Sequence, residues 1–133
     1  MQGVAWFFVL HRPNMKKQFD ILIVDDEPEI GLLLSAMLKD MGHAVKVSAN
    51  LYEARQVLNG FCPDVVLLDL NLPDGSGFSF LPVVRELHPL AKVIICSAYD
   101  GPAERKRAEI SGAETFLGKP FTSEQLEKAL MQL

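Results

Sequence analysis

The chain has 133 residues, enough for one domain with a substantial hydrophobic core and too few for two. Hydrophobic residues make up 49% of the sequence and charged residues 23%, as in an ordinary globular protein. The formal net charge is -4 and there is no basic tract, which argues against direct nucleic-acid binding by this chain. Cys62 and Cys96 lie far apart, outside any metal-binding or redox spacing. We predict that both are reduced, mostly buried thiols, which fits a cytoplasmic protein.

The first 18 residues differ in character from the rest. Residues 3–10 form an apolar run too short to span a bilayer, which takes about 20 residues, and the run lacks the basic start and cleavage site of a signal peptide. We therefore expect residues 1–18 to be an extension outside the domain and residues 19–133 to form the domain. The extension could be disordered, pack on a neighbouring molecule through its aromatic residues, or attach weakly to a membrane. Met15 could be the natural start.

Strand and helix patterns alternate five times after the extension. Short apolar, β-branched runs predict strands over residues 19–24, 44–48, 65–70, 92–97 and 114–117. Apolar spacings of three and four residues, with capping signals, predict helices over residues 28–41, 50–60, 78–88, 102–111 and 122–133. This alternation predicts an α/β fold: a doubly wound, five-stranded parallel sheet of order 2-1-3-4-5 with helices on both faces.

Two of these helices have unusual features. Pro82 would kink the third helix if the helix began at Ser76, whereas a start near Ser79 would place Pro82 in the first turn, where it is tolerated. We expect a kinked or late-starting helix. The helix over residues 102–111 has few large apolar residues, mainly Ile110, so we expect it to be weakly packed and mobile.

Acidic residues follow two strands that are neighbours in the expected sheet. Asp25 and Asp26 end the first strand, and Asp69 ends the third, which is apolar enough to be buried on both faces. Ligands of open α/β sheets bind at the carboxyl ends of the strands. Two carboxylates roughly 5 Å apart repel by about 3 kcal/mol at an effective dielectric constant near 20, so a pKa must rise or a cation must bind. Hard oxygen ligands favour Mg²⁺.

A hydroxyl and an ammonium group are expected at the same edge. Ser97 ends the fourth strand and could donate a hydrogen bond to a phosphate oxygen, while Lys119 follows the fifth strand and could pair with Asp69. Each residue alone has an ordinary explanation. The acidic pair could favour a helix N-terminus, Asp69 could be a turn residue, and Ser97 or Lys119 could be structural or solvated. Their conjunction at four strand ends favours a phosphoryl acceptor site centred on Asp69.

This set of residues resembles the receiver domain of two-component response regulators, the family that includes the single-domain chemotaxis regulators. The resemblance covers residues 19–133. It rests on four stretches: Val24-Asp25-Asp26-Glu27-Pro28, residues 69–77 from Asp69 to Gly77, Ser97-Ala98 and Lys119-Pro120-Phe121.

The resemblance implies a flavodoxin-like (βα)5 three-layer sandwich that acts as a phosphorelay switch and not as an enzyme. Asp69 would take its phosphoryl group from a sensor histidine kinase or a phosphotransfer protein. Asp26 and Asp69 would bind Mg²⁺ directly, together with the backbone carbonyl of Asn71, while Asp25 would act mainly through water. Mn²⁺ or Ca²⁺ could substitute for Mg²⁺.

Further implications concern the response to phosphorylation. Ser97 and Lys119 would hold the phosphoryl oxygens, and Phe116 would be the switch aromatic that moves inward; it lacks the hydroxyl of a tyrosine. The bond before Pro120 would be cis. An output partner or a dimer would use the family's fourth helix, fifth strand and fifth helix, which include residues 102–111. The chain could be a complete single-domain regulator or the receiver portion of a longer protein.

Three alternatives are left open by the residues alone. An FMN-binding module of similar topology would need a Ser/Thr-rich phosphate loop after the first strand, where this chain is acidic. A haloacid-dehalogenase-type phosphatase would need an Asp-x-Asp signature there and more room for a cap. A receiver fold that has lost phosphorylation and acts only in binding is the third, against which the complete acidic set argues.

Overall fold

The structure, a computed structural model, describes residues 17–133. Five parallel strands form one sheet in the order β2-β1-β3-β6-β7. They are β1 (Asp20–Val24), β2 (Ala44–Ser48), β3 (Val65–Asp69), β6 (Lys92–Ser97) and β7 (Thr115–Gly118). This is the predicted order 2-1-3-4-5. Residues 1–16 lie outside the described residues, so the expectations for the extension are untested there.

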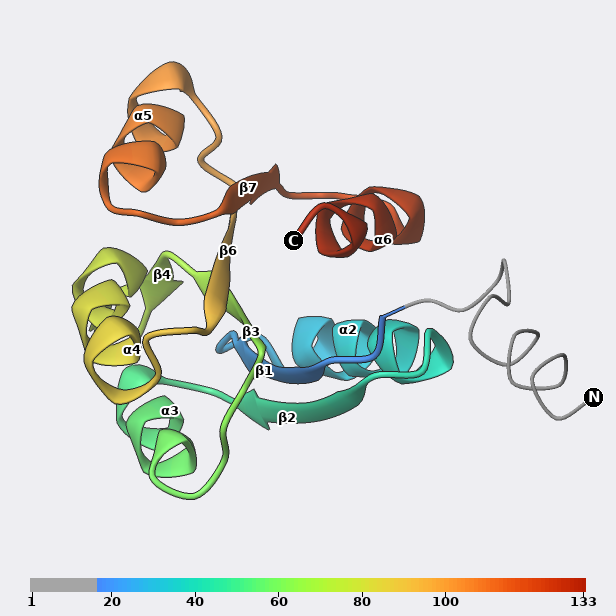
Figure 1. The fold of residues 1–133 in the computed structure, drawn as a ribbon. Helices are drawn as coiled ribbons and strands as arrows, with labels where there is room; N and C mark the ends of the chain where they lie inside the picture. Colours follow the sequence, from blue (N-terminus) through green and yellow to red (C-terminus); the bar gives the residue numbers. More distant parts are fainter. Residues whose placement is uncertain (1–16) are drawn as a thin grey trace, which may run out of the picture.

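The helices cover both faces of the sheet. They are α2 (Pro28–Asp40), α3 (Leu51–Leu58), α4 (Leu81–Leu87), α5 (Pro102–Ile110) and α6 (Ser123–Met131). In Figure 1, α2 and α6 lie on one side of the strands and α3, α4 and α5 on the other. Each side has its own core: Leu34, Leu38 and Leu126 pack on one face of the sheet, and Ala54, Leu81 and Ala108 on the other. The arrangement is the predicted three-layer sandwich.

The three inner strands are buried because their sequences are apolar on both faces. Every residue of β3 is buried, as are Ile21–Val24 in β1 and Val93–Ser97 in β6. A parallel strand covered by helices on both sides needs such a continuous apolar run. The register pairs Asp69 with Cys96, and Ser97 with Gly118, so the polar strand ends lie side by side.

The region between β3 and β6 differs from its prediction in detail. Between the strand predicted over residues 65–70 and the helix predicted over residues 78–88, Asn71–Leu72 (β4) and Gly75–Ser76 (β5) pair as a small antiparallel hairpin that was not predicted. A 3₁₀ helix, η1 (Gly77–Phe80), follows, and α4 begins only at Leu81. Pro82 therefore lies in the first turn of α4, where its missing N–H costs nothing. The late-starting alternative is confirmed, although Phe80 and not Ser79 precedes the helix.

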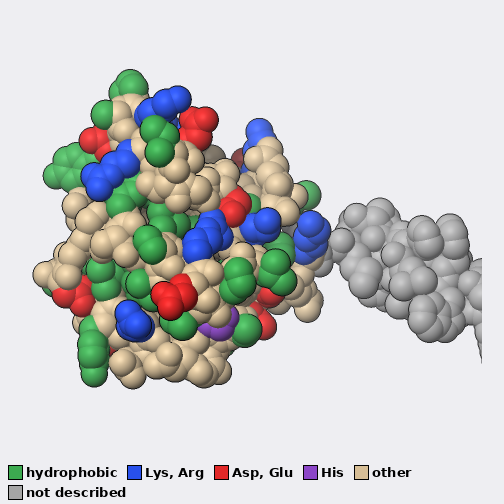
Figure 2. All heavy atoms as spheres, turned by 60° about the vertical axis from the view of Figure 1, so that its left-hand side comes forward, with side chains coloured by type: hydrophobic (Ala, Val, Ile, Leu, Met, Phe, Trp, Pro, Cys, Tyr) green, Lys and Arg blue, Asp and Glu red, His purple; other side chains and the backbone are tan. Residues whose placement is uncertain are grey.

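Two further differences concern exposure. Ile110, the main large apolar residue of α5, is 75% exposed, and Ala108 is the one residue of α5 that is buried. The weak packing predicted for α5 is present, while its mobility stays a prediction. Cys62 is exposed, so the prediction of two buried thiols holds only for Cys96. On the face shown in Figure 2, acidic and basic side chains are interspersed and do not form one basic patch.

Candidate functional site

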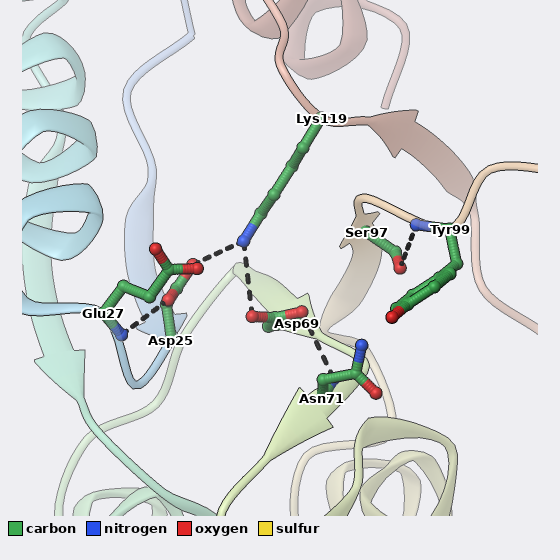
Figure 3. A network of polar contacts seen from close by, with 7 residues as sticks. All are labelled: Asp25, Glu27, Asp69, Asn71, Ser97, Tyr99 and Lys119. Carbon is green, nitrogen blue, oxygen red and sulfur yellow. Dashed lines mark hydrogen bonds and ion pairs between the residues drawn. The ribbon is translucent and has the colours of Figure 1, made fainter.

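Four of the predicted site residues meet at the carboxyl edge of the sheet. Asp25 follows β1, Asp69 ends β3, Ser97 ends β6 and Lys119 follows β7. Figure 3 shows the lysine side chain reaching down between the two aspartates. Asp25 is 4% exposed, Asp69 7% and Ser97 0%. Burial of three polar side chains at one strand edge is costly unless they have partners, so their contacts define the site.

Lys119 is the cation of the site. Its Nζ donates to Asp25 Oδ2 at 2.8 Å and to Asp69 Oδ2 at 3.3 Å. Burial by itself would lower the pKa of Lys119, but the hydrogen bond to Asp25 and the negative charges of both aspartates outweigh it, so the pKa is raised. Lys119 therefore stays charged and partly neutralises the two carboxylates.

The surroundings of Asp69 disfavour its ionised form in spite of the contact with Lys119. Its Oδ1 accepts a hydrogen bond from the backbone N–H of Asn71 at 3.3 Å. Burial raises the pKa of Asp69, and the nearby charge of Asp25 adds to the rise. Lys119 and the Asn71 N–H act against it without cancelling it. The carboxylate is thus an incompletely neutralised anion, which an additional cation would stabilise.

The acidic cluster differs in one member from the expected one. Within residues 17–133, carboxylate oxygens of Asp25, Glu27 and Asp69 lie within 4.8 Å of one another. Asp26 is exposed and is not in this group. The chain bends at Asp26, between Asp25 and Glu27, and the carboxylates of Asp25 and Glu27 come together across this bend. The role of Asp26 as a direct ligand remains a prediction.

Glu27 is a site residue that the sequence reasoning missed. Its backbone N–H donates to Asp25 Oδ1 at 2.9 Å, which fixes the turn from β1 into α2. The bend at Asp26 that places Glu27 there has no periodic signature in the sequence.

The hairpin after Asp69 is held against the site. The N–H of Gly77 donates to the Leu70 carbonyl. A Cβ at position 77 would overlap the Asp69 carbonyl oxygen, so glycine permits this close approach. On its outer side, the Asp74 carboxylate accepts from the N–H groups of Leu51 and Tyr52 at 2.9 and 3.0 Å. The hairpin is therefore fixed between Asp69 and the N-terminus of α3.

Ser97, in β6, lies at the same strand edge but makes no hydrogen bond to Asp69 within residues 17–133, and Phe116 lies one strand further out, in β7. Ser97 Oγ accepts a hydrogen bond from the Tyr99 N–H at 3.1 Å, as Figure 3 shows. The Phe116 ring is partly buried, and the Arg105 guanidinium lies 4.9 Å from its centroid. The Lys119–Pro120 peptide bond is cis, as the resemblance implied.

Comparison with known proteins decides the family. The sequence profile of the response regulator receiver domain matches residues 21–131. The chain belongs to this family. This receiver domain is a signalling module and not a classical enzyme. None of the helices in the described part of the chain combines the length and apolar character needed to cross a bilayer.

Individual relatives agree with this assignment. A putative NtrX-like response regulator of Rickettsia felis is 36% identical over 111 residues, which are 82% of this chain and 23% of that protein. This chain thus spans less than a quarter of that relative. The chemotaxis response regulator CheY4 of Vibrio cholerae is 28% identical with a TM-score of 0.79, covering 89% and 98% of the two chains.

A third relative carries the modification itself. A response regulator of Burkholderia pseudomallei, solved with a phosphorylated aspartic acid, a calcium ion and citrate, has a TM-score of 0.78 at 28% identity. The match covers 86% of this chain and 66% of that one. The receiver fold of this chain is therefore shared with a protein that is phosphorylated on aspartate.

Proposed function

We propose that Asp69 is the phosphoryl acceptor of this receiver domain and that the donor is a phosphohistidine on a sensor histidine kinase or a phosphotransfer protein. The observation that carries the proposal is a buried carboxylate at the end of the central strand, beside a lysine and two further carboxylates. A carboxylate oxygen of Asp69 attacks phosphorus, the P–N bond to the donor imidazole breaks, and an acyl phosphate forms. Asp69 is restored when water hydrolyses that bond.

The donor set fits a divalent cation, for which we propose Mg²⁺, with Mn²⁺ or Ca²⁺ able to substitute. The three clustered carboxylates are hard oxygen ligands, and Asp69 is incompletely neutralised by Lys119. Asp25, Asp69 and the Asn71 carbonyl would hold the ion, with Glu27 or Asp26 supplying a further carboxylate. When bound, the ion neutralises charge on the incoming phosphoryl group. The phosphorylated relative from Burkholderia contains calcium.

We propose that Ser97 and Lys119 hold the phosphoryl oxygens and that Phe116 moves inward in response to phosphorylation. Lys119 Nζ is already 3.3 Å from an Asp69 oxygen. The Ser97 hydroxyl oxygen accepts from Tyr99, but its proton is free to be donated to a phosphoryl oxygen. Movement of Ser97 would pull on the loop that begins at Tyr99, and the face formed by α5, β7 and α6 would present the change to an output partner or a second copy.

We place the domain at residues 19–133, with residues 1–18 as an extension, in a cytoplasmic protein.

Treatment with acetyl phosphate and Mg²⁺ is expected to add the mass of one phosphoryl group to the wild type and none to Asp69→Asn. A chelator should prevent the addition. Glu27→Gln and Asp26→Asn separate the two candidate ligands, because the one that contributes should weaken Mg²⁺ binding about ten- to a hundred-fold more than the other. The geometry assigns the larger effect to Glu27. Equal mass gains in wild type and Asp69→Asn would refute the proposal.

Arg105 is expected to restrain the loop between β6 and α5. Its Nε donates to the Asp100 carbonyl at 3.1 Å while its guanidinium covers Phe116. In Arg105→Ala, hydrogen exchange at the Tyr99 amide should become about two- to five-fold faster, the factor that a cation–π contact of about 0.5–1 kcal/mol implies. The matched control is Arg107→Ala, because Arg107 covers Phe78 at 4.2 Å instead. Equal exchange rates in the two variants would show that Arg105 does not hold the loop.

A further inference from the structure

A cysteine–histidine pair lies at the opposite edge of the sheet, near the amino ends of the strands. Cys62 precedes β3, and His88 is the C-terminal cap of α4. Cys62 Sγ is 3.2 Å from His88 Nδ1, and His88 Nε2 is 2.8 Å from the Leu58 carbonyl oxygen. His88 lies 26 residues from Cys62 and 30 residues from Leu58 in the sequence, and the three groups form a chain of hydrogen bonds across two helix ends.

The Leu58 carbonyl determines which atoms donate and which accept in these hydrogen bonds. A carbonyl oxygen can only accept, so His88 Nε2 must carry the ring proton. In the neutral imidazole, Nδ1 then holds a lone pair and accepts from the Cys62 thiol. This is the arrangement of an activated nucleophile: a thiol, a base within reach of its proton, and a third group that orients the base.

The site is also accessible and has room for a reactant. Cys62 is exposed. It borders a groove of about 540 Å³ whose apolar lining includes Phe19, Leu87 and Leu90. Asp64 and Lys92 are the charged side chains that line the groove, while the neighbouring Arg85 is engaged by the Ala91 and Gly112 carbonyls. The groove can therefore accept a small molecule bonded to the sulfur.

Cys96 offers an internal contrast. It lies in β6 and is only 3% exposed. Burial raises the pKa of its thiol to about 12. A buried thiol that stays protonated is inert toward electrophiles.

We propose that Cys62 is a thiol modification site that takes low-molecular-weight disulfides, with His88 as its base. Cys62 Sγ attacks one sulfur of the disulfide as its proton passes to His88 Nδ1. The S–S bond of the reactant breaks, a mixed disulfide forms on Cys62, and the imidazolium gives the proton to the departing thiolate. One disulfide and one thiol are consumed, and one mixed disulfide and one thiol are produced, so no further oxidant is needed.

Oxidised glutathione added to the folded chain at neutral pH provides the test. The intact mass should rise by one glutathionyl group in the wild type and in Cys96→Ser but not in Cys62→Ser. Peptide mapping should place the group on Cys62. In His88→Gln, whose amide can still donate to the Leu58 carbonyl, the reaction should be about ten-fold slower. This is less than the effect of a base in an enclosed site, because bulk water can also take the proton.

The pH profile separates a base from a merely structural histidine. In strongly alkaline buffer, hydroxide removes the proton of a thiol without a neighbouring base, so the rates of His88→Gln and wild type should converge. A slowing of His88→Gln by the same factor at every pH would mean that His88 only controls access, and would overturn the proposal. Equal rates at neutral pH, or labelling of Cys96 in the folded chain, would overturn it as well.

Discussion

Replacing Lys119 with methionine is expected to lower the free energy of unfolding by about 3 kcal/mol at neutral pH in metal-free buffer. Lys119 is the cation that contacts both Asp25 and Asp69, and the two carboxylates are almost completely buried. Removing it leaves two buried like charges without a counter-charge, which costs more than the loss of an exposed ion pair. Urea unfolding measures the loss.

The loss should depend on pH in a defined direction. The folded-state pKa of Asp69 is already above its ordinary value because of burial, and Lys119 opposes that rise. Without Lys119 the pKa should rise further. The loss of unfolding free energy in Lys119→Met should therefore be largest at neutral pH. It should shrink as the pH falls through the raised pKa of Asp69, because a protonated Asp69 needs no cation. Mg²⁺ should restore part of the stability at neutral pH.

Lys106→Met is the matched control for this substitution. Lys106 is exposed on α5, so its loss should change the unfolding free energy by less than about 0.5 kcal/mol. A similar small change in Lys119→Met, or a deficit that grows toward acid pH, would show that the lysine does not neutralise the buried carboxylates.

Gly77→Ala is expected to destabilise the domain by about 2 kcal/mol and to disturb the acceptor site. The added Cβ would overlap the Asp69 carbonyl oxygen and lie 3.1 Å from both the Asp69 carbonyl carbon and the Leu70 Cα. All three are backbone atoms of the buried strand end, so no side chain can rotate to relieve the overlap. We expect lower stability by urea unfolding and slower labelling by acetyl phosphate, since the Asp69 backbone must shift.

Gly60→Ala provides the comparison. A Cβ at Gly60 meets no atom within 4 Å, so the same substitution there should be neutral or slightly stabilising through the unfolded state. If the two variants unfold at the same urea concentration, the close approach of Gly77 to Asp69 does not constrain the site.

The sequence predicted those features that depend on strand ends and apolar runs. The strands were placed to within one or two residues because inner parallel strands are continuously apolar, and their order brought Asp25, Asp69, Ser97 and Lys119 to one edge. The cis bond before Pro120 came from the family resemblance and not from the residues themselves.

What the sequence did not predict depends on local direction and on long-range contact. Glu27 joins the acidic cluster across a bend at Asp26, which neither composition nor periodicity reveals. The β4–β5 hairpin has two residues in each strand, too few for a periodic pattern. The contact between Cys62 and His88 links residues 26 positions apart through the packing of two helix ends, so a spacing argument on the cysteines alone could not find it.

The central claim is that Asp69, and no neighbouring carboxylate, becomes phosphorylated. Three carboxylates share the site, so the position of the modification is the decisive observation. Acetyl phosphate with Mg²⁺ forms the acyl phosphate, borohydride reduces it to a stable alcohol, and peptide mass mapping locates the altered residue. The account predicts conversion of Asp69 alone, to homoserine. Conversion of Asp25, Asp26 or Glu27 in its place, or an unaltered Asp69 in fully labelled protein, would contradict it.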